Sequence, residues 1–181
     1  GYLHAGVGIC AVVGDQLYFY YSGWSGKSPN ANADWEMYGG GATGLATLRR
    51  DGFVSMDAKE NEGTLTTRPV KFKGKYPFVN VNAPKGVLCA EILDENDKVI
   101  APFSMENSLP VTADKTRVKL AWKGAEDLGA LTGRNVKFRF KLKNGELYSF
   151  WVSPSESGAS QGYVAAGGPE FNGPMDTVGG K

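Results

Sequence analysis

Residues 135–152 read NVKFRFKLKNGELYSFWV, and this stretch decides the fold class. Between residues 135 and 143, Val, Phe, Phe and Leu alternate with Lys, Arg, Lys and Lys, so a β-strand would carry the apolar set on one face and the cations on the other. Asn144-Gly145 follows, a dipeptide typical of tight hairpin turns because both of its residues tolerate a positive φ. Residues 146–152 then predict a second strand that returns as the other half of a hairpin.

Two more segments predict hairpins in the same way. Val12-Val13 turns at Gly14-Asp15 into residues 17–21, and residues 46–50 turn at Asp51-Gly52 into residues 53–56. Other short runs rich in Val, Phe, Leu and Thr lie between recurring turn signals, and they predict strands over residues 65–72, 78–81, 87–93, 98–100 and 117–122.

The pattern as a whole predicts an all-β protein. Only residues 125–131 carry a helix signal, of one or two turns, which ends at Gly133. We therefore expect an antiparallel two-sheet β-sandwich of jelly-roll or concanavalin-like type, with about ten strands. Residues 22–41 and 153–181 are rich in Gly and poor in strand pattern, which is typical of long loops that carry function or pack on another surface.

The composition limits the classes of binding partner that the chain can have. The chain of 181 residues is 41% hydrophobic and 22% charged, as in a globular protein with a packed core. Its 20 Lys and Arg against 19 Asp and Glu leave a net charge of +1, which argues against nucleic acid as a partner. No apolar run reaches the roughly 18 residues that a membrane-spanning helix needs.

The residues that nucleophilic catalysis or zinc binding would need are scarce. His4 is the single histidine, and the two cysteines, Cys10 and Cys89, lie in separate apolar runs that predict buried, inert thiols. One disulfide would be possible if those runs were neighbours. Residues 94–97 (DEND) offer oxygen ligands for calcium but lack the full loop pattern, so an acidic turn is the favoured interpretation. We therefore predict no metal, no cofactor and no catalytic residue.

The best candidate binding residues lie in the Gly-rich loop. Sugars stack their C–H faces on aromatic rings, and acids or amides take their hydroxyl groups. The tentative carbohydrate-binding residues are Trp24, Trp35, Tyr38, Asp34 and Glu36, with Asn32 beside them. The alternatives are that these aromatic residues cover a hydrophobic face or a neighbouring domain, or that Asp34 and Glu36 form a glycosidase pair. Trp122 and Trp151 lie in strand patterns and are expected in the core.

The cations of residues 137–143 allow two interpretations. Lys137, Arg139, Lys141 and Lys143 could form a stripe for a polyanion. A row of this kind is more often a solvated sheet face that also discourages edge pairing, and the balanced net charge favours that interpretation.

Several motifs resemble a known family. They are residues 43–58 (TGLATLRRDGFVSMDA), 63–69 (GTLTTRP), 78–81 (FVNV), 91–94 (EILD) and 145–153 (GELYSFWVS). Together they are similar to the C-terminal β-sandwich of large bacterial glycosyl hydrolases in which a five-bladed β-propeller of the family 32 and family 43 type precedes the sandwich. The resemblance covers residues 5–153 and extends to residues 162–169 (GYVAAGGP).

The resemblance implies a domain organisation and a function. Residues 1–41 would be a remnant of the last propeller blade with a Gly-rich aromatic loop, residues 42–153 the sandwich, and residues 154–181 a tail that packs back on the fold. The family's catalytic acids lie on earlier blades, so no catalytic residue carries over to this chain. The expected function is a non-catalytic accessory domain of a carbohydrate-active protein, with a lectin-like module or a purely structural domain as the alternatives.

The expected partners and location follow from the same resemblance. The partners are a carbohydrate, the propeller of the same parent chain, and a second copy bound through the apolar run of the blade remnant. That run consists of Val12, Val13, Leu17, Phe19 and Tyr21. The implied location is secreted, periplasmic or at the cell surface.

Overall fold

The structure is a computed structural model that describes residues 1–5, 10–26, 39–164 and 167–178. It divides into two units, Gly1–Arg50 with Tyr163–Met175, and Asp51–Gly162 with Asp176–Lys181. This division differs from the boundary at 41/42 that the sequence predicts, because residues 41–49 pair along their whole length with residues 16–24.

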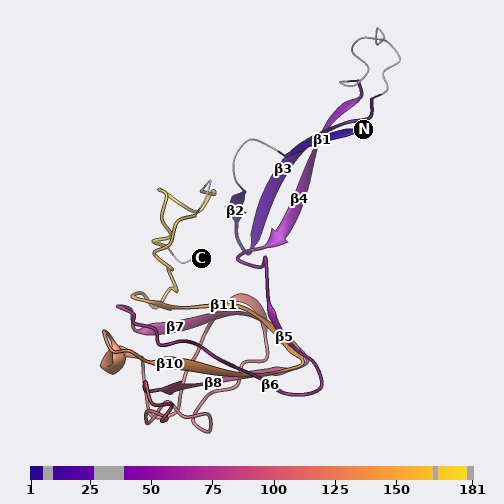
Figure 1. Cartoon of the computed structure of the whole chain (residues 1–181). Helices are drawn as coiled ribbons and strands as arrows, with labels where there is room; N and C mark the ends of the chain where they lie inside the picture. The colour runs from indigo at the N-terminus through magenta and orange to yellow at the C-terminus, as the bar shows by residue number, and fades with distance from the viewer. Residues whose placement is uncertain (6–9, 27–38, 165–166, 179–181) are drawn as a thin grey trace. The chain divides into compact units, whose positions relative to one another are not determined.

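Eleven β-strands lie in the described ranges (Figure 1). The first unit contains β1 (Tyr2–Ala5), β2 (Ala11–Val13), β3 (Gln16–Trp24) and β4 (Gly41–Arg49). The second contains β5 (Met56–Ala58), β6 (Gly63–Thr66), β7 (Tyr76–Asn82), β8 (Val87–Leu93), β9 (Asp114–Lys119), β10 (Lys137–Lys143) and β11 (Gly145–Ser153). A 3₁₀-helix (η2, Gly129–Leu131) falls within the short segment where the sequence carries its helix signal.

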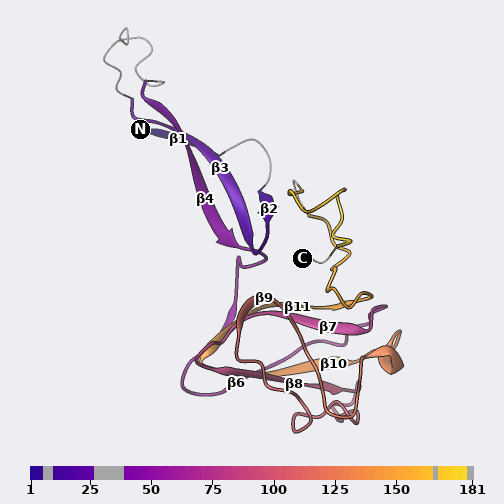
Figure 2. The same ribbon diagram turned by 180° about the vertical axis from the view of Figure 1, so that it is seen from behind.

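The second unit is a sandwich of two antiparallel sheets (Figures 1 and 2). Sheet B has the order β5-β11-β7-β9, and sheet C has the order β6-β10-β8. Val111 extends sheet C by a two-way backbone bridge to Leu88, with both N···O distances at 2.9 Å. With Val111 in the place of an eighth strand, this is the strand order of a jelly roll. The predicted all-β sandwich is confirmed.

The turn at Asn144-Gly145 does not form the predicted hairpin. β10 pairs with β8 and β6, whereas β11 pairs with β7 and β5, so Asn144 carries the chain from sheet C to sheet B. The reason is that both strands have an apolar face, and the two faces meet across the core. The ring centroids of Phe138 and Phe140 each lie 5.2 Å from that of Phe150 on the opposite sheet. The connection is therefore a β-arch.

Two more connections cross between the sheets beside this arch. The segments β5–β6 and β7–β8 also lead from sheet B to sheet C, and their strands flank β11 and β10 in the two sheets. The Asn144 amide donates to the Lys59 carbonyl (2.9 Å) of the β5–β6 connection. On the other side, a Cβ on Gly145 would lie 2.7 Å from the Ala83 Cβ, and a Cβ on Gly86 would overlap the carbonyls of Lys143 and Asn144. The three arches therefore stack with no room for a side chain at these two glycines.

The core lies between sheets B and C. Val79 and Val81 of β7 and Leu88 and Ile92 of β8 are fully buried in it. Trp122 is buried as predicted, and its indole N–H donates to the Ala90 carbonyl at 2.8 Å. Trp151 is only partly buried, since it stacks on Phe78 near the sandwich surface with a centroid distance of 5.6 Å.

The first unit contains the four-stranded sheet A. β3 is its central strand: β4 pairs along one side, and β1 and β2 share the other side. The predicted β2–β3 hairpin is confirmed, with Val13 opposite Gln16. The predicted hairpin at Asp51-Gly52 is wrong, because β4 turns back on β3, and residues 56–58 pair with β11 instead.

The core aromatic residues offer a test of the arch. Phe138→Ala removes a buried ring that packs on Phe72, Phe140 and Phe150, and we expect it to lower the free energy of unfolding by about 3–5 kcal/mol. Phe53→Ala is the matched control, because Phe53 is 67% exposed and its truncation should cost under about 1 kcal/mol. Urea denaturation followed by tryptophan fluorescence measures both. Equal losses would contradict this packing.

The backbone of Asn144 offers a second test. Its φ is 47°, in the left-handed region that Asn and Gly tolerate and β-branched residues do not. Asn144→Gly should leave stability within about 0.5 kcal/mol, whereas Asn144→Val should lower it by about 1–2 kcal/mol in the same urea experiment. If Val were tolerated as well as Gly, the arch would not depend on this conformation.

Candidate functional site

Sheet A carries five aromatic rings on one face. Successive side chains of a strand point to opposite faces, and paired residues share a face. The register of β1 and β4 on β3 therefore sorts the sheet into two sets. The first set, here named the aromatic face, consists of Tyr2, His4, Tyr18, Tyr20 and Trp24.

Trp24 lies at the centre of a local cluster on the aromatic face. It is directly opposite Tyr2 in the β1–β3 ladder, and the His4 ring meets it edge-on with centroids 5.3 Å apart. Its indole also lies against Gly41 of β4, where a Cβ would be 3.1 Å from Nε1. Tyr20, four residues before Trp24, is 56% exposed. Because alternate residues on a strand are about 6.8 Å apart, Tyr20 and Trp24 offer two rings about 13 Å apart along one strand.

Hydrogen-bonding groups lie between these rings. Ser22 pairs with Thr43 between Tyr20 and Trp24, and Thr47 pairs with Tyr18 further along β4. By this register, the side chains of Ser22, Thr43 and Thr47 lie on the aromatic face. The aromatic face therefore combines flat rings with hydroxyl groups at regular spacing.

The opposite face of sheet A, here named the apolar face, differs in character. It consists of Leu3, Ala5, Val12, Leu17, Phe19, Tyr21, Ala42, Ala46 and Leu48. Val12 and Leu17 are buried in a small cluster with Cys10 and Val164, and Phe171 packs on its border. Toward the other end of β3, the Tyr21 ring lies over Gly44, where there is no space for a Cβ, and Leu3 is 69% exposed.

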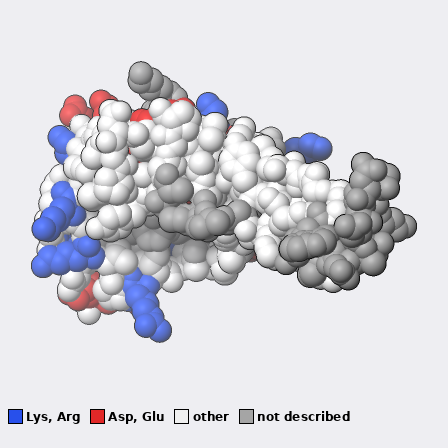
Figure 3. Space-filling model, turned by 90° about the horizontal axis from the view of Figure 1, so that it is seen from above, with Lys and Arg blue, Asp and Glu red and all other residues white. Residues whose placement is uncertain are grey.

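Sheet A is nearly free of charged residues. Of the Lys, Arg, Asp and Glu residues of the chain, its four strands hold only Arg49. On the face of the molecule shown in Figure 3, the surface next to the grey residues at the right is mostly white. A ligand of this sheet would therefore be recognised by stacking and neutral hydrogen bonds rather than by ion pairs.

Only part of the predicted carbohydrate site can be placed. Trp24 lies on the aromatic face. Trp35, Tyr38, Asp34 and Glu36, together with Asn32, lie outside the described residues. Tyr18 and Tyr20 were missed, although they lie six and four residues before Trp24, and these even spacings are a sequence signal for one strand face. Tyr2 and His4 could not be placed from sequence, because only the β1–β3 pairing brings them beside Trp24.

The predicted cation row on β10 is matched by acids. Lys137 Nζ lies 2.8 Å from an Asp97 oxygen, Arg139 lies 2.8 Å from Glu91, and Lys141 lies 2.9 Å from Glu62. These ion pairs involve three of the four cations of the row on the outer face of sheet C. The geometry fits a solvated sheet face better than a stripe for a polyanion.

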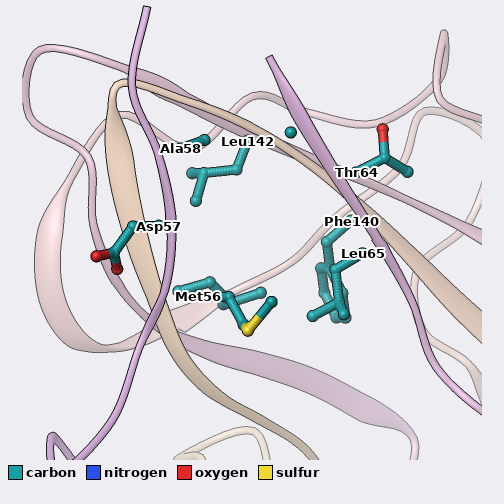
Figure 4. A pocket seen from close by; sticks show the side chains of 9 residues that line it. Met56, Asp57, Ala58, Thr64, Leu65, Phe140 and Leu142 are labelled. Atoms are coloured by element: carbon teal, nitrogen blue, oxygen red, sulfur yellow. The ribbon is translucent and has the colours of Figure 1, made fainter. Parts of the chain in front are cut away.

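An apolar pocket lies at the edge of the sandwich and is shown in Figure 4. It lies between β5 and β6, the edge strands of sheets B and C, and its volume is about 70 Å³. Met56, Leu65, Phe140 and Leu142 line it, whereas Asp57 carries its carboxylate on the outside and accepts from Ser55 at 2.6 Å. The pocket is small and has few polar groups, so it does not offer the converging hydrogen bonds that a sugar needs.

Within the described ranges no metal site is found. No group of three His, Cys, Asp or Glu residues is placed to hold a metal there. Cys10 and Cys89 are free thiols, and Cys89 is half-buried on the outer side of β8 rather than fully buried. Asp94 accepts from the amides of Asn96 (2.8 Å) and Lys98 (2.9 Å), so its carboxylate is used within its own turn.

Comparison with known proteins gave no match: no family model, no curated protein and no solved structure matches this chain. A separate finding concerns membranes. Among the residues that the structure describes, none belongs to a helix with the length and apolar character needed to cross a bilayer.

The ion pair of Lys137 and Asp97 gives a prediction on pH. The hydrogen bond from Lys137 holds the pKa of Asp97 below its ordinary value of 3.8. Because the pKa is lower in the folded state than in the unfolded state, the pair stabilises the fold above about pH 4, and this contribution is lost as the pH falls through the folded pKa. In an NMR titration, Lys137→Met should raise the pKa of Asp97. Lys141→Met, which removes the partner of Glu62, is the control and should leave it unchanged.

Proposed function

We propose that this chain is a non-catalytic accessory domain of a carbohydrate-active protein, and that the aromatic face of sheet A contacts the glycan. The observation that carries the proposal is the alignment of Tyr20 and Trp24 on one strand, with Tyr2 and His4 beside Trp24. These residues come from two strands that are separate in the sequence. The sheet brings them to a single surface.

The chemistry of that surface suits a neutral sugar chain. The rings offer apolar planes for the C–H faces of pyranose rings, and Ser22, Thr43 and Thr47 offer hydroxyl groups for sugar hydroxyls. The only charged residue of the four strands is Arg49, at the end of β4, so an acidic polymer gains little here. A flat, extended face also favours a polymer over a small molecule, which would need a concave pocket.

The resemblance of the sandwich motifs to glycosyl hydrolase C-terminal domains supports the same class of protein. In that family the catalytic acids lie on the propeller blades. The role of the chain is then to bind or position, with the reaction performed elsewhere in the parent protein. A secreted or cell-surface location, and a propeller as partner, follow from the same proposal.

A structural role is the second candidate, and a specific observation favours it. Leu3 is exposed on the apolar face, and the small residues Ala5, Ala42 and Ala46 lie on the same face without a second layer in the described ranges. Stable domains cover the apolar face of a sheet with another layer. A neighbouring domain of the parent protein would supply that layer.

Substitutions on the two faces separate these functions. We first identify a ligand on an array of neutral oligosaccharides and then measure its affinity by calorimetry. Trp24→Ala and Tyr20→Ala should each weaken binding about tenfold, equivalent to about 1.4 kcal/mol, because each removes one stacking plane. Leu3→Ala, on the opposite face and 69% exposed, is the matched control and should leave the affinity unchanged.

The opposite results are also informative. An array without any bound glycan would contradict the proposed function and leave the structural role. A bound glycan whose affinity ignores Trp24 and Tyr20 would place the site elsewhere. Hydrolysis of a glycoside by this chain alone would contradict the non-catalytic assignment.

A further inference from the structure

β4 is an open edge of sheet A. It is nine residues long and pairs with β3 along its whole length. In the described part of the chain, β3 is its only neighbouring strand. An edge strand exposes a row of backbone N–H and C=O groups that can pair with another chain.

The backbone bonds show which residues of β4 face that edge. The amide of Arg50 donates to the Asp15 carbonyl at 2.8 Å, which marks the even-numbered residues as bonded to the β3 side. Hydrogen bonding alternates between the two sides of an antiparallel strand. The N–H and C=O groups of Thr43, Leu45 and Thr47 therefore point away from β3, toward the open edge.

The β2 edge on the far side of β3 is covered differently. By the same alternation the Val12 amide points outward, and it donates to the Gly167 carbonyl at 2.8 Å. A Cβ on Gly168 would overlap the Val12 carbonyl, so residues 167–168 lie directly against this edge. In the described ranges, the β2 edge of sheet A is thus covered by its own chain, whereas the β4 edge is open.

The sequence of β4 lacks the features that usually protect an edge. Residues 41–48 (GATGLATL) contain no charge, no proline and no register shift against β3. Natural edge strands are commonly protected by Lys, by Pro, by a bulge or by their shortness. A strand of this length with neutral side chains is suited to backbone pairing with a strand of another chain.

We infer that β4 pairs antiparallel with β4 of a second copy of this chain, about a two-fold axis at Leu45. In that register Leu45 meets its own counterpart, and Thr43 meets Thr47, with all three among the outward-bonding residues. Cross-strand pairs of Thr with Thr are favourable. A two-fold interface requires such a self-complementary strand.

Charge selects this arrangement over a parallel one. Arg49 and Arg50 follow the neutral run at one end of β4. In a parallel pair the arginines of the two chains would be adjacent, whereas in the antiparallel pair Arg49 meets Gly41 and the arginines lie at opposite ends. Like charges directly opposite each other in a sheet are destabilising.

The pairing has a consequence for the proposed function but does not depend on it. The two-fold axis would be perpendicular to the sheet, so the aromatic faces of both copies would lie on the same side of one continuous sheet. Two rows of rings would then be available to a single glycan or to neighbouring chains. The pairing itself is tested without any glycan.

Sedimentation equilibrium of the full chain tests the interface. We expect a dimer whose dissociation constant rises at least tenfold in Leu45→Pro, because proline lacks the outward amide that the second copy would bind and leaves the bonds to β3 in place. Leu45→Thr is the matched control: it keeps the backbone amide and introduces a β-branched side chain that suits a strand, so it should leave the dimer intact. A chain that remains monomeric at all concentrations would overturn the inference.

A cysteine pair tests the register and covers the case in which the proline variant fails to fold. In Leu45→Cys the two thiols face each other across a pair with Cα atoms about 5.5 Å apart, within disulfide range, so mild oxidation should give a covalent dimer. In Thr47→Cys the two thiols would lie about 13 Å apart along the sheet and should not cross-link. The unsubstituted chain, with Cys10 and Cys89, is the background control. Equal cross-linking by both variants would overturn this register.

Discussion

The crossing of the chain from sheet C to sheet B at Lys143–Gly145 is the constraint on which the sandwich depends. The two strands that it joins hold the central positions of their sheets, and their Phe side chains fill the space between the layers. The arch can be this tight because Asn144 adopts a positive φ, and because Gly145 and Gly86 let neighbouring arches approach to backbone contact. A hairpin at the same place would pair the two strands within one sheet, so their apolar faces could not meet across the core.

Local sequence could predict the strands but not this connection. The bounds of β8 agree with the predicted residues 87–93, and the alternation over residues 137–143 is correct to the residue. Asn-Gly, however, favours a positive φ in a hairpin and in an arch alike, and two amphipathic strands can pair side by side or face to face. The choice between them is made by β6, β8, β5 and β7, which are distant in sequence. The same limit applies to the aromatic face: Trp24 was predicted and the spacing of Tyr18 and Tyr20 is readable, but Tyr2 and His4 join them only through the register of β1.

The two units differ in how fully their apolar side chains are buried. The sandwich buries a core of aliphatic and aromatic side chains, and ion pairs such as Lys137–Asp97 and Arg139–Glu91 lie on its surface. In the described ranges, sheet A has a small buried cluster near Cys10, Val12 and Leu17, and it exposes rings on one face, small apolar residues on the other and the backbone of β4 at one edge. We propose that these surfaces are binding surfaces, with a neutral glycan on the aromatic face and a second copy of the chain at β4.

Amide hydrogen exchange of the full chain, with and without a glycan that binds it, tests this division most directly. The account predicts slow exchange in β7, β8, β10 and β11 that the glycan leaves unchanged, together with faster exchange in the distal parts of β1, β3 and β4 that slows when the glycan is bound. Glycan-dependent protection confined to Met56–Ala58 and Gly63–Thr66, the strands that line the pocket in Figure 4, would contradict it, because the binding site would then belong to the sandwich.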